Sequence, residues 1–222
     1  VVRVDVGSGG QSFGTFHAGS EICALAISKD RLMLATSDIS AEPKIALWVA
    51  LNVAEGPSRV IRGPHLNAIT LLAFDDDKGK TLVSLGADDR HMVAVHDVTS
   101  GYLLFMSSTT CRKPFHVAFG NFGSEIVIVG IKYVLFFTFL ANHAATRHAS
   151  ASFGRIGRLG TIQSYLSCAY LPNATCVVGT ADGHLYVFEG SSRELAKSIK
   201  AHDGFIYSMD APWHRAEQVR AI

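Results

Sequence analysis

Residues 165–189 read YLSCAYLPNATCVVGTADGHLYVFE, and this stretch decides the fold. It holds three short runs rich in apolar, β-branched and aromatic residues, at 165–171, 176–180 and 185–188. Runs of this length are typical of β-strands. The residues Ala181-Asp182-Gly183 between the last two runs are typical of a tight turn, which gives Asp182 a structural role. The stretch therefore predicts consecutive strands joined by short turns.

The same three runs recur in the same order along the 222-residue chain. Copies of the first run read ICALAIS, ITLLAFD, PFHVAFG and IYSMDAP, and copies of the second read LMLATSD, TLVSLGADD and EIVIVG. Copies of the third run read VRVD, IALWV, VAVHD and LFFT. With LYVFE, their reference positions are 4, 48, 96, 137 and 188, in steps of 44, 48, 41 and 51. Three elements in one order at one approximate period indicate a repeat architecture.

Four strands fit into each repeat, and the middle strands are nearly all apolar. A single four-stranded sheet cannot cover two apolar faces alone, whereas sheets stacked radially cover each other. The chain is 48% apolar and 18% charged, which excludes a disordered chain. Helical periodicity is nowhere sustained. We therefore predict an all-β fold of four-stranded antiparallel blades in a partial ring of about four to five blades.

We expect one partial β-propeller domain over residues 1–222. The predicted blade ranges are the end of one blade at 1–6, blades at 11–49, 58–97, 102–138 and 148–189, and the start of another at 194–211. Phe205–Ala211 is predicted as a first strand, and QVRAI at 218–222 as the beginning of the next. A ring with open ends exposes unpaired sheet faces, so we expect the remaining blades of the same protein to close it.

These runs resemble the WD-repeat β-propellers. The Gly-His pair of that class is partly present at His17, His65 and His202, and its Trp-Asp pair survives only in part, at Trp48, Asp5 and Asp97. The resemblance implies a buried hydrogen-bond network in the first blade, formed by His17, Thr36 or Ser37, Asp38 and Trp48. In the other blades we expect apolar packing instead, because half-satisfied polar networks are costly.

The degenerate repeats resemble, more narrowly, the echinoderm microtubule-associated protein-like family. The segments that carry the resemblance are HAGSEICALAISKDRLMLATSD, DISAEPKIALWV, DDRHMVAVHDVTSG and KSIKAHDGFIYSMDAP. This resemblance implies a non-enzymatic interaction scaffold that binds tubulin or microtubules, with a cytoplasmic, cytoskeletal and possible ciliary or flagellar location. The alternative is a generic WD-repeat scaffold that binds a peptide or a subunit of another assembly, such as a ciliary complex.

Charge is distributed unevenly although the formal net charge is only +1. Residues 98–181 hold six basic residues and one acid, Glu125, while the flanking segments are net acidic. The segment ANHAATRHASASFGRIGRLG concentrates this charge, and we predict a partner-binding surface at Arg147, His148, Arg155 and Arg158 that meets an acidic partner such as the tubulin tails. The competing interpretation is an exposed edge whose charges block edge-to-edge pairing. The chain has no overall excess of basic residues, so we expect no nucleic-acid partner.

No enzyme, cofactor or metal is predicted. The sequence lacks G-x-S-x-G, phosphate-loop and H-E-x-x-H motifs, and the first strands of the repeats offer few polar side chains to a central channel. The four cysteines contain no C-x-x-C pair, which favours free thiols over a zinc site. The most apolar stretch, 126–141, is too short to span a bilayer and is predicted as two buried strands, so we expect no membrane partner.

Overall fold

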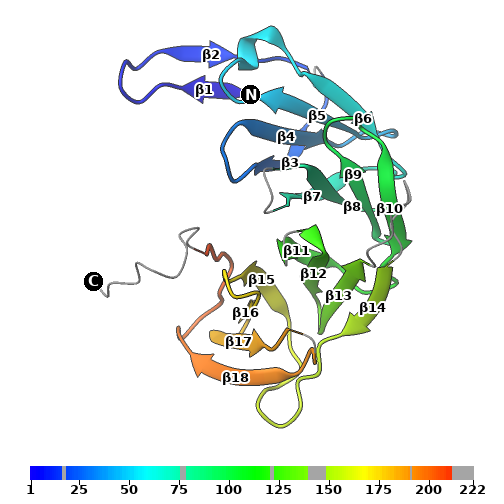
Figure 1. Cartoon of the computed structure of the whole chain (residues 1–222), viewed down its shortest axis with the longest axis vertical. Helices are drawn as coiled ribbons and strands as arrows, with labels where there is room; N and C mark the ends of the chain where they lie inside the picture. The colour runs from blue at the N-terminus through cyan, green and yellow to red at the C-terminus, as the bar shows by residue number, and fades with distance from the viewer. Residues whose placement is uncertain (17–18, 76–78, 121–122, 140–148, 191, 212–222) are drawn as a thin grey trace. The chain divides into compact units, whose positions relative to one another are not determined.

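The computed structural model describes residues 1–16, 19–75, 79–120, 123–139, 149–190 and 192–211 (Figure 1). These residues form two compact units, one from Val1–Thr110 and one from Cys111 onward. Within the described ranges the regular structure is almost entirely β, and a 3-10 turn, η1 (Val53–Glu55), interrupts it in the first unit. No helix in this part of the chain is long and apolar enough to cross a membrane.

The first unit contains a two-stranded sheet and two four-stranded sheets, all antiparallel. The two-stranded sheet pairs β1 (Val2–Val4) with β2 (Gln11–Phe13). The next sheet contains β3 (Ile22–Ile27), β4 (Met33–Asp38), β5 (Lys44–Val49) and β6 (Arg59–Arg62). The last contains β7 (Ile69–Phe74), β8 (Thr81–Gly86), β9 (Met92–Asp97) and β10 (Leu103–Ser108).

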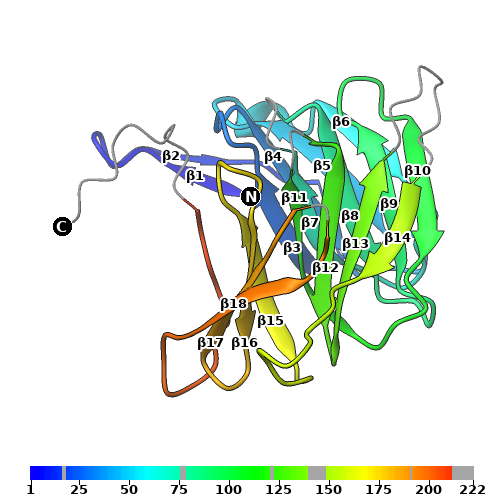
Figure 2. The same cartoon turned by 60° about the horizontal axis from the view of Figure 1, so that its bottom comes forward.

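The second unit contains two further four-stranded antiparallel sheets (Figure 2). One consists of β11 (Pro114–Gly120), β12 (Glu125–Gly130), β13 (Tyr133–Phe139) and β14 (Ala149–Phe153). The other consists of β15 (Tyr165–Tyr170), β16 (Cys176–Thr180), β17 (His184–Phe188) and β18 (Leu195–Lys200). The predicted all-β fold of four-stranded blades is thus confirmed, and the apolar stretch from residue 126 forms two strands, β12 and β13.

The sheets are offset by one strand from the repeats found in the sequence. The predicted blade at 58–97, for example, contains β6, β7, β8 and β9, but β6 pairs with β5 of the preceding sheet. The same holds for β10, β14 and β18, each of which completes the sheet before it. Each sequence repeat therefore gives its first strand to the preceding sheet.

The second strand of each sheet lies in the core. All residues of β8 and β12 are buried, which explains why β12 reads as a continuous apolar run after Glu125, whereas β8 also buries Thr81 and Ser84. In the first unit, Ile45 and Leu47 of β5 share a core cluster with Ile69 of β7. In the second unit, Val127 of β12 shares a cluster with Tyr165 of β15. Within each unit, neighbouring sheets are therefore held together by apolar side chains that leave water.

One predicted strand is wrong. Phe205–Ala211 does not form a strand, because a β-strand exchanges a series of backbone hydrogen bonds with a neighbouring strand, and among the described residues this segment makes one such bond, from Ile206. Instead, Ile206 docks on the last sheet: its N–H donates to Thr180 O at 3.2 Å, and Ser167 Oγ donates to Ile206 O at 2.7 Å. The further strand predicted at 218–222 lies outside the described residues.

Candidate interaction surface

The predicted partner-binding residues flank β14 in the sequence, two before it and two after it. Arg147 and His148 fall outside the described residues, whereas Arg155 and Arg158 are both exposed. Arg155 also has a structural role: its guanidinium lies 3.0 Å from the Glu194 carboxylate and donates to Ser192 O at 2.9 Å. Residue 155 further forms an isolated parallel β-bridge with residue 194. Arg155, one residue of the predicted surface, therefore connects the segment after β14 to the turn between β17 and β18.

The single acid of residues 98–181 is buried and neutralised. Glu125 is 1% exposed and forms an ion pair with Arg193, which lies in the turn between β17 and β18. Arg193 Nη1 donates to Glu125 Oε1 at 3.0 Å and Nη2 donates to Thr138 Oγ1 at 2.9 Å. The Tyr170 hydroxyl also donates to this carboxylate. Burial raises the pKa of Tyr170 well above its ordinary value, and the neighbouring thiol of Cys176 and the Glu125 carboxylate add to the shift.

Burial of Glu125 leaves cations as the exposed charges along the described parts of residues 98–181. Arg112, Lys113, Lys132, Arg155 and Arg158 are all exposed there. Arg193 comes from outside this segment, so a count of charges along the chain does not reveal that it neutralises Glu125. The exposed charges that the described part of this segment itself contributes are thus all positive.

Two separate pockets lie beside β14, and Phe153 lines both. The first has a volume of about 320 Å³ and is lined by Lys132, Val134, Phe153, Ile156, Ile162 and Tyr165, among others. The second has a volume of about 470 Å³ and is lined by Thr138, Ser150, Ser152, Arg155, Ser192 and Arg193 as well as Phe153. We call these the apolar pocket and the polar pocket, and together the β14 groove. The sequence did not indicate this groove, because its walls come from three separate segments.

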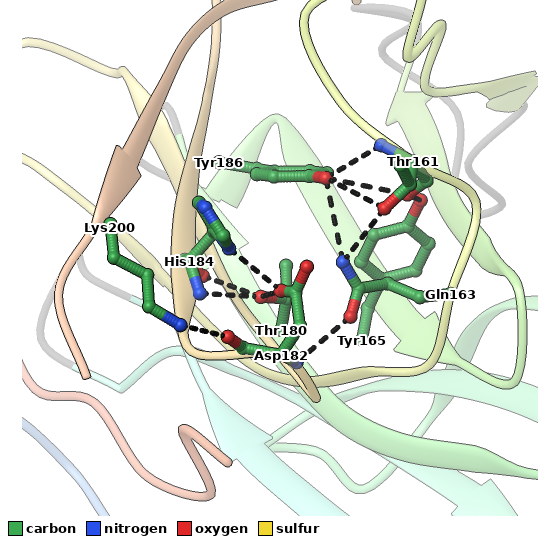
Figure 3. A network of polar contacts seen from close by, with 8 residues as sticks. All are labelled: Thr161, Gln163, Tyr165, Thr180, Asp182, His184, Tyr186 and Lys200. Carbon is green, nitrogen blue, oxygen red and sulfur yellow. Dashed lines mark hydrogen bonds and ion pairs between the residues drawn. The ribbon is translucent and has the colours of Figure 1, made fainter. Parts of the chain in front are cut away.

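A polar network closes the turn between β16 and β17 (Figure 3). Thr180 Oγ1 donates to Asp182 Oδ1 at 2.6 Å, and His184 Nδ1 lies 3.0 Å from the same oxygen. Burial by itself raises the pKa of Asp182, but hydrogen bonds with Thr180, Gln163 and His184 outweigh it and lower the pKa to about 2. These bonds hold the turn between β16 and β17.

A second part of the network in Figure 3 fixes the segment that leads into β15. The backbone N–H of Thr161 donates to the Tyr186 hydroxyl at 2.7 Å, and Gln163 Oε1 accepts from the Asp182 N–H at 2.9 Å. Lys200 Nζ donates to Asp182 O at 2.7 Å. These polar groups thus bond to one another and to the backbone.

Trp48 is fully buried in β5, and its indole N–H donates to Thr36 Oγ1 of β4 at 2.9 Å. Ser37, the alternative to Thr36 in the predicted network, instead donates to Ile69 O of the next sheet at 2.7 Å. Asp38 accepts from the Lys44 N–H at 2.8 Å, at the turn into β5. His17, the remaining predicted member, lies outside the described residues.

The expectation of purely apolar packing in the other blades is wrong for the β7–β10 sheet. His65 Nε2 lies 2.7 Å from Ser84 Oγ, and both side chains are buried. His96, which stands where the repeat carries its Trp, is 1% exposed. Burial and the nearby His96 lower the pKa of His65 to about 4, and burial also lowers the pKa of His96 to about 4. Both rings are therefore neutral at physiological pH, which is how they fit a core.

The two remaining predicted structural residues lie in turns. Ser100 N and Oγ donate to Asp97 Oδ1 at 2.6 and 2.7 Å, so Asp97 closes the turn between β9 and β10. His202 has an exposed side chain and contributes its backbone N–H to Gly183 O at 3.0 Å. Among the described residues, no three His, Cys, Asp or Glu side chains are grouped so as to hold a metal ion. The four cysteines are free.

Known proteins resemble the chain in fold more than in sequence. No protein-family model matches it. The β-propeller domain of Cps50 (Swd1) from Myceliophteria thermophila superposes with a TM-score of 0.68 at 14% identity, over 89% of this chain and 61% of that one. The C-terminal WD40 domain of Sif2 superposes with a TM-score of 0.64 at 15% identity, over 89% of this chain and 52% of that one. The chain therefore has the WD40 β-propeller fold.

A curated relative is similar in sequence as well. Cilia- and flagella-associated protein 44 of Chlamydomonas reinhardtii is 22% identical to the chain, over 94% of the chain and 12% of the relative. The chain thus spans a small part of that protein's length. The WD-repeat part of the predicted resemblance is confirmed by the fold, and the narrower assignment to the echinoderm microtubule-associated protein-like family stays a prediction.

Proposed function

We propose that this chain is a non-enzymatic protein-interaction module of a cilium- or flagellum-associated cytoskeletal protein, and that it docks an acidic partner on the second unit. The observation that carries the proposal is the buried Glu125–Arg193 pair, which removes the only acid of residues 98–181 from the surface. Lys132 and Arg158 are exposed, and Arg155 is 66% exposed while it pairs with Glu194. A surface of one sign attracts partners of the other sign and speeds their encounter.

Tubulin is the first candidate partner, because its carboxy-terminal tails are acidic and because a sequence relative is named for cilia and flagella. The test is co-sedimentation of the full chain with microtubules at increasing salt. We expect the bound fraction to fall as salt rises, since exposed ion pairs are screened. Charge reversal at Arg147, Arg155 and Arg158 to Glu should reduce binding further.

A matched variant separates surface location from net charge. Reversal of Arg31, Arg62 and Arg90, which are exposed on the first unit, changes the net charge equally and should leave co-sedimentation near the wild-type level. Equal loss of binding in both triple variants would show that only total charge matters. Full binding by the Arg147, Arg155 and Arg158 variant would remove this surface from the proposal.

The second candidate is a scaffold that binds another subunit of a ciliary or flagellar assembly instead of tubulin. The sequence relative favours it directly, since its name refers to the organelle and not to microtubules. Pull-down by the full chain from a flagellated-cell extract, with tubulin either present or removed beforehand, distinguishes the two. Captured proteins that persist after tubulin removal favour the second candidate.

A further inference from the structure

The β14 groove combines an apolar pocket with polar groups and positive charge. Phe153 and Ile162 line the apolar pocket although they are 58% and 68% exposed. Leu159, which lies with Ile162 between β14 and β15, is 56% exposed. Large apolar side chains gathered at the surface are typical of a binding site, because their burial by a partner releases water. A volume of about 320 Å³ is at the small end of the range for ligand pockets, so one large side chain would occupy most of it.

The polar half of the groove is suited to carboxylates. The hydroxyl groups of Ser150, Ser152 and Ser192 line it and can donate hydrogen bonds, as can the guanidinium of Arg155. Arg155 is 66% exposed while it contacts Glu194, so part of its donor fork faces solvent. Lys132 at the apolar pocket and Arg158 in the adjoining segment add two further cations.

Strand β14 offers an exposed edge that defines the direction in which a bound peptide could lie. It is the edge strand of its sheet, paired on one side with β13, and residues 150–153 are exposed. Extended peptides bind along such edges, where their backbone pairs with the strand and alternate side chains enter flanking pockets. Both pockets include Phe153. A peptide side chain in the apolar pocket would therefore place the neighbouring residues of that peptide close to the polar pocket.

From this geometry we infer that the β14 groove binds a short acidic peptide segment of a partner protein, with one large apolar side chain in the apolar pocket and flanking Asp or Glu residues at the polar pocket, Lys132 and Arg158. The inference rests on the proposed role as an interaction module and specifies the chemistry of its partner. Charge complementarity favours this occupant, because the two acids that contact groove residues in ion pairs, Glu194 with Arg155 and Glu125 with Arg193, are already matched by those arginines, while Lys132 and Arg158 are exposed.

A peptide-display selection on the full chain tests the inference even though the partner is unidentified. We expect enriched sequences to contain a large apolar residue flanked by Asp or Glu. A selected peptide, synthesised with a fluorescent label, should then bind with an affinity that falls as salt rises. Enrichment of basic or uncharged sequences, or no enrichment, would overturn the inference.

Substitutions in the groove give the decisive comparison. Ile162→Asp should weaken the selected peptide about ten-fold or more, because it places a carboxylate in the apolar pocket beside an acidic ligand. Lys132→Glu should weaken it and flatten the salt dependence. Leu51→Asp is the matched control, since Leu51 is 61% exposed and lies on the first unit. Circular dichroism checks that each variant folds, and Ile162→Ser provides a milder replacement at the same site.

These results are distinguishable from those of the co-sedimentation test. Peptide binding that is lost in Ile162→Asp while the chain fails to bind microtubules would support the groove and reject tubulin as the partner. Peptide binding that is unchanged in Ile162→Asp would overturn the groove, whatever the result with microtubules.

Discussion

At the scale of single residues, Trp48 shows how one preserved aromatic stabilises a degenerate repeat. Its ring is fully buried, and it packs beside Leu34 of the adjoining strand β4 and Ala46 of its own strand. Trp48→Ala should lower the free energy of unfolding by about 3–5 kcal/mol, because it opens a large cavity and removes the hydrogen bond to Thr36. Chemical denaturation followed by circular dichroism measures the change.

Trp48→Phe serves as the graded control for this prediction. It keeps most of the buried ring and loses the N–H donor, so the expected cost is about 1–2 kcal/mol. A loss below about 1 kcal/mol in Trp48→Ala would contradict the burial of this side chain.

The buried histidines His65 and His96 make stability depend on pH. Both have a folded-state pKa of about 4, below their ordinary value of 6.5, so the unfolded chain binds protons more readily. The resulting stability is fully present above about pH 6.5 and is lost as the pH falls toward about 4, by on the order of a few kcal/mol for the pair. Denaturation midpoints measured across this pH range give the slope.

Substitution isolates the contribution of these rings to the pH profile. His96→Phe should make the decline shallower, since an apolar ring at this buried site cannot take up a proton when the chain unfolds. His202→Asn should leave the profile unchanged, because the His202 side chain is exposed. Identical slopes in wild type and His96→Phe would show that His96 does not cause the dependence.

At the scale of elements, the Glu125–Arg193 pair joins strand β12 to the turn between β17 and β18. The Arg193 guanidinium also lies over the Phe136 ring, 4.7 Å from its centre. Arg193→Ala should destabilise the chain by about 3–5 kcal/mol, because it leaves a buried carboxylate without its counter-charge. Thermal unfolding and denaturation curves measure the loss.

The double variant separates the charge from the packing. Glu125→Leu combined with Arg193→Met removes both charges, and it should recover most of the stability lost in Arg193→Ala. If the double variant is less stable than Arg193→Ala, then the two sheets depend on the ion pair itself rather than on the absence of an unpaired charge.

At the scale of the whole molecule, exposed apolar residues on β3 predict self-association. Ile22, Leu25 and Ile27 are 47%, 61% and 54% exposed, which is unusual for a strand of this composition. The chain should therefore associate as its concentration rises, and Leu25→Lys with Ile27→Lys should reduce this. Analytical ultracentrifugation measures it. Leu51→Lys with Leu66→Lys is the control pair, and a monodisperse wild type at every concentration would contradict the prediction.

Most of the fold could be predicted from the sequence, because the repeating order of apolar runs reflects strands that are buried on both faces. β12 is a nearly continuous apolar segment for this reason, whereas β8 also carries the buried polar residues Thr81 and Ser84. The sheet to which each strand belongs was not visible, since pairing of β6 with β5 depends on contacts that no local pattern encodes. The predicted strand at Phe205–Ala211 was wrong for a similar reason. Its composition suits a strand, but a strand forms only where a second strand pairs with it.

The candidate site was predicted only in its charge. Arg155 and Arg158 stood out because the surrounding sequence is basic and rich in small residues. The apolar pocket did not, since Lys132 comes from a different segment than Phe153 and Ile162 and each residue is ordinary in its own context. The role of Arg193 was equally hidden, because its partner Glu125 lies 68 positions away.

The one-strand offset between repeat and sheet bears on how such a gene can be divided. A stop codon or exon boundary placed after a sequence repeat, for instance after residue 138, would strip β14 from its sheet and leave β13 with an open edge. The same cut placed after residue 153 would leave that sheet complete. Splice variants and truncated alleles that follow the repeats should therefore produce less soluble products than those that follow the sheets.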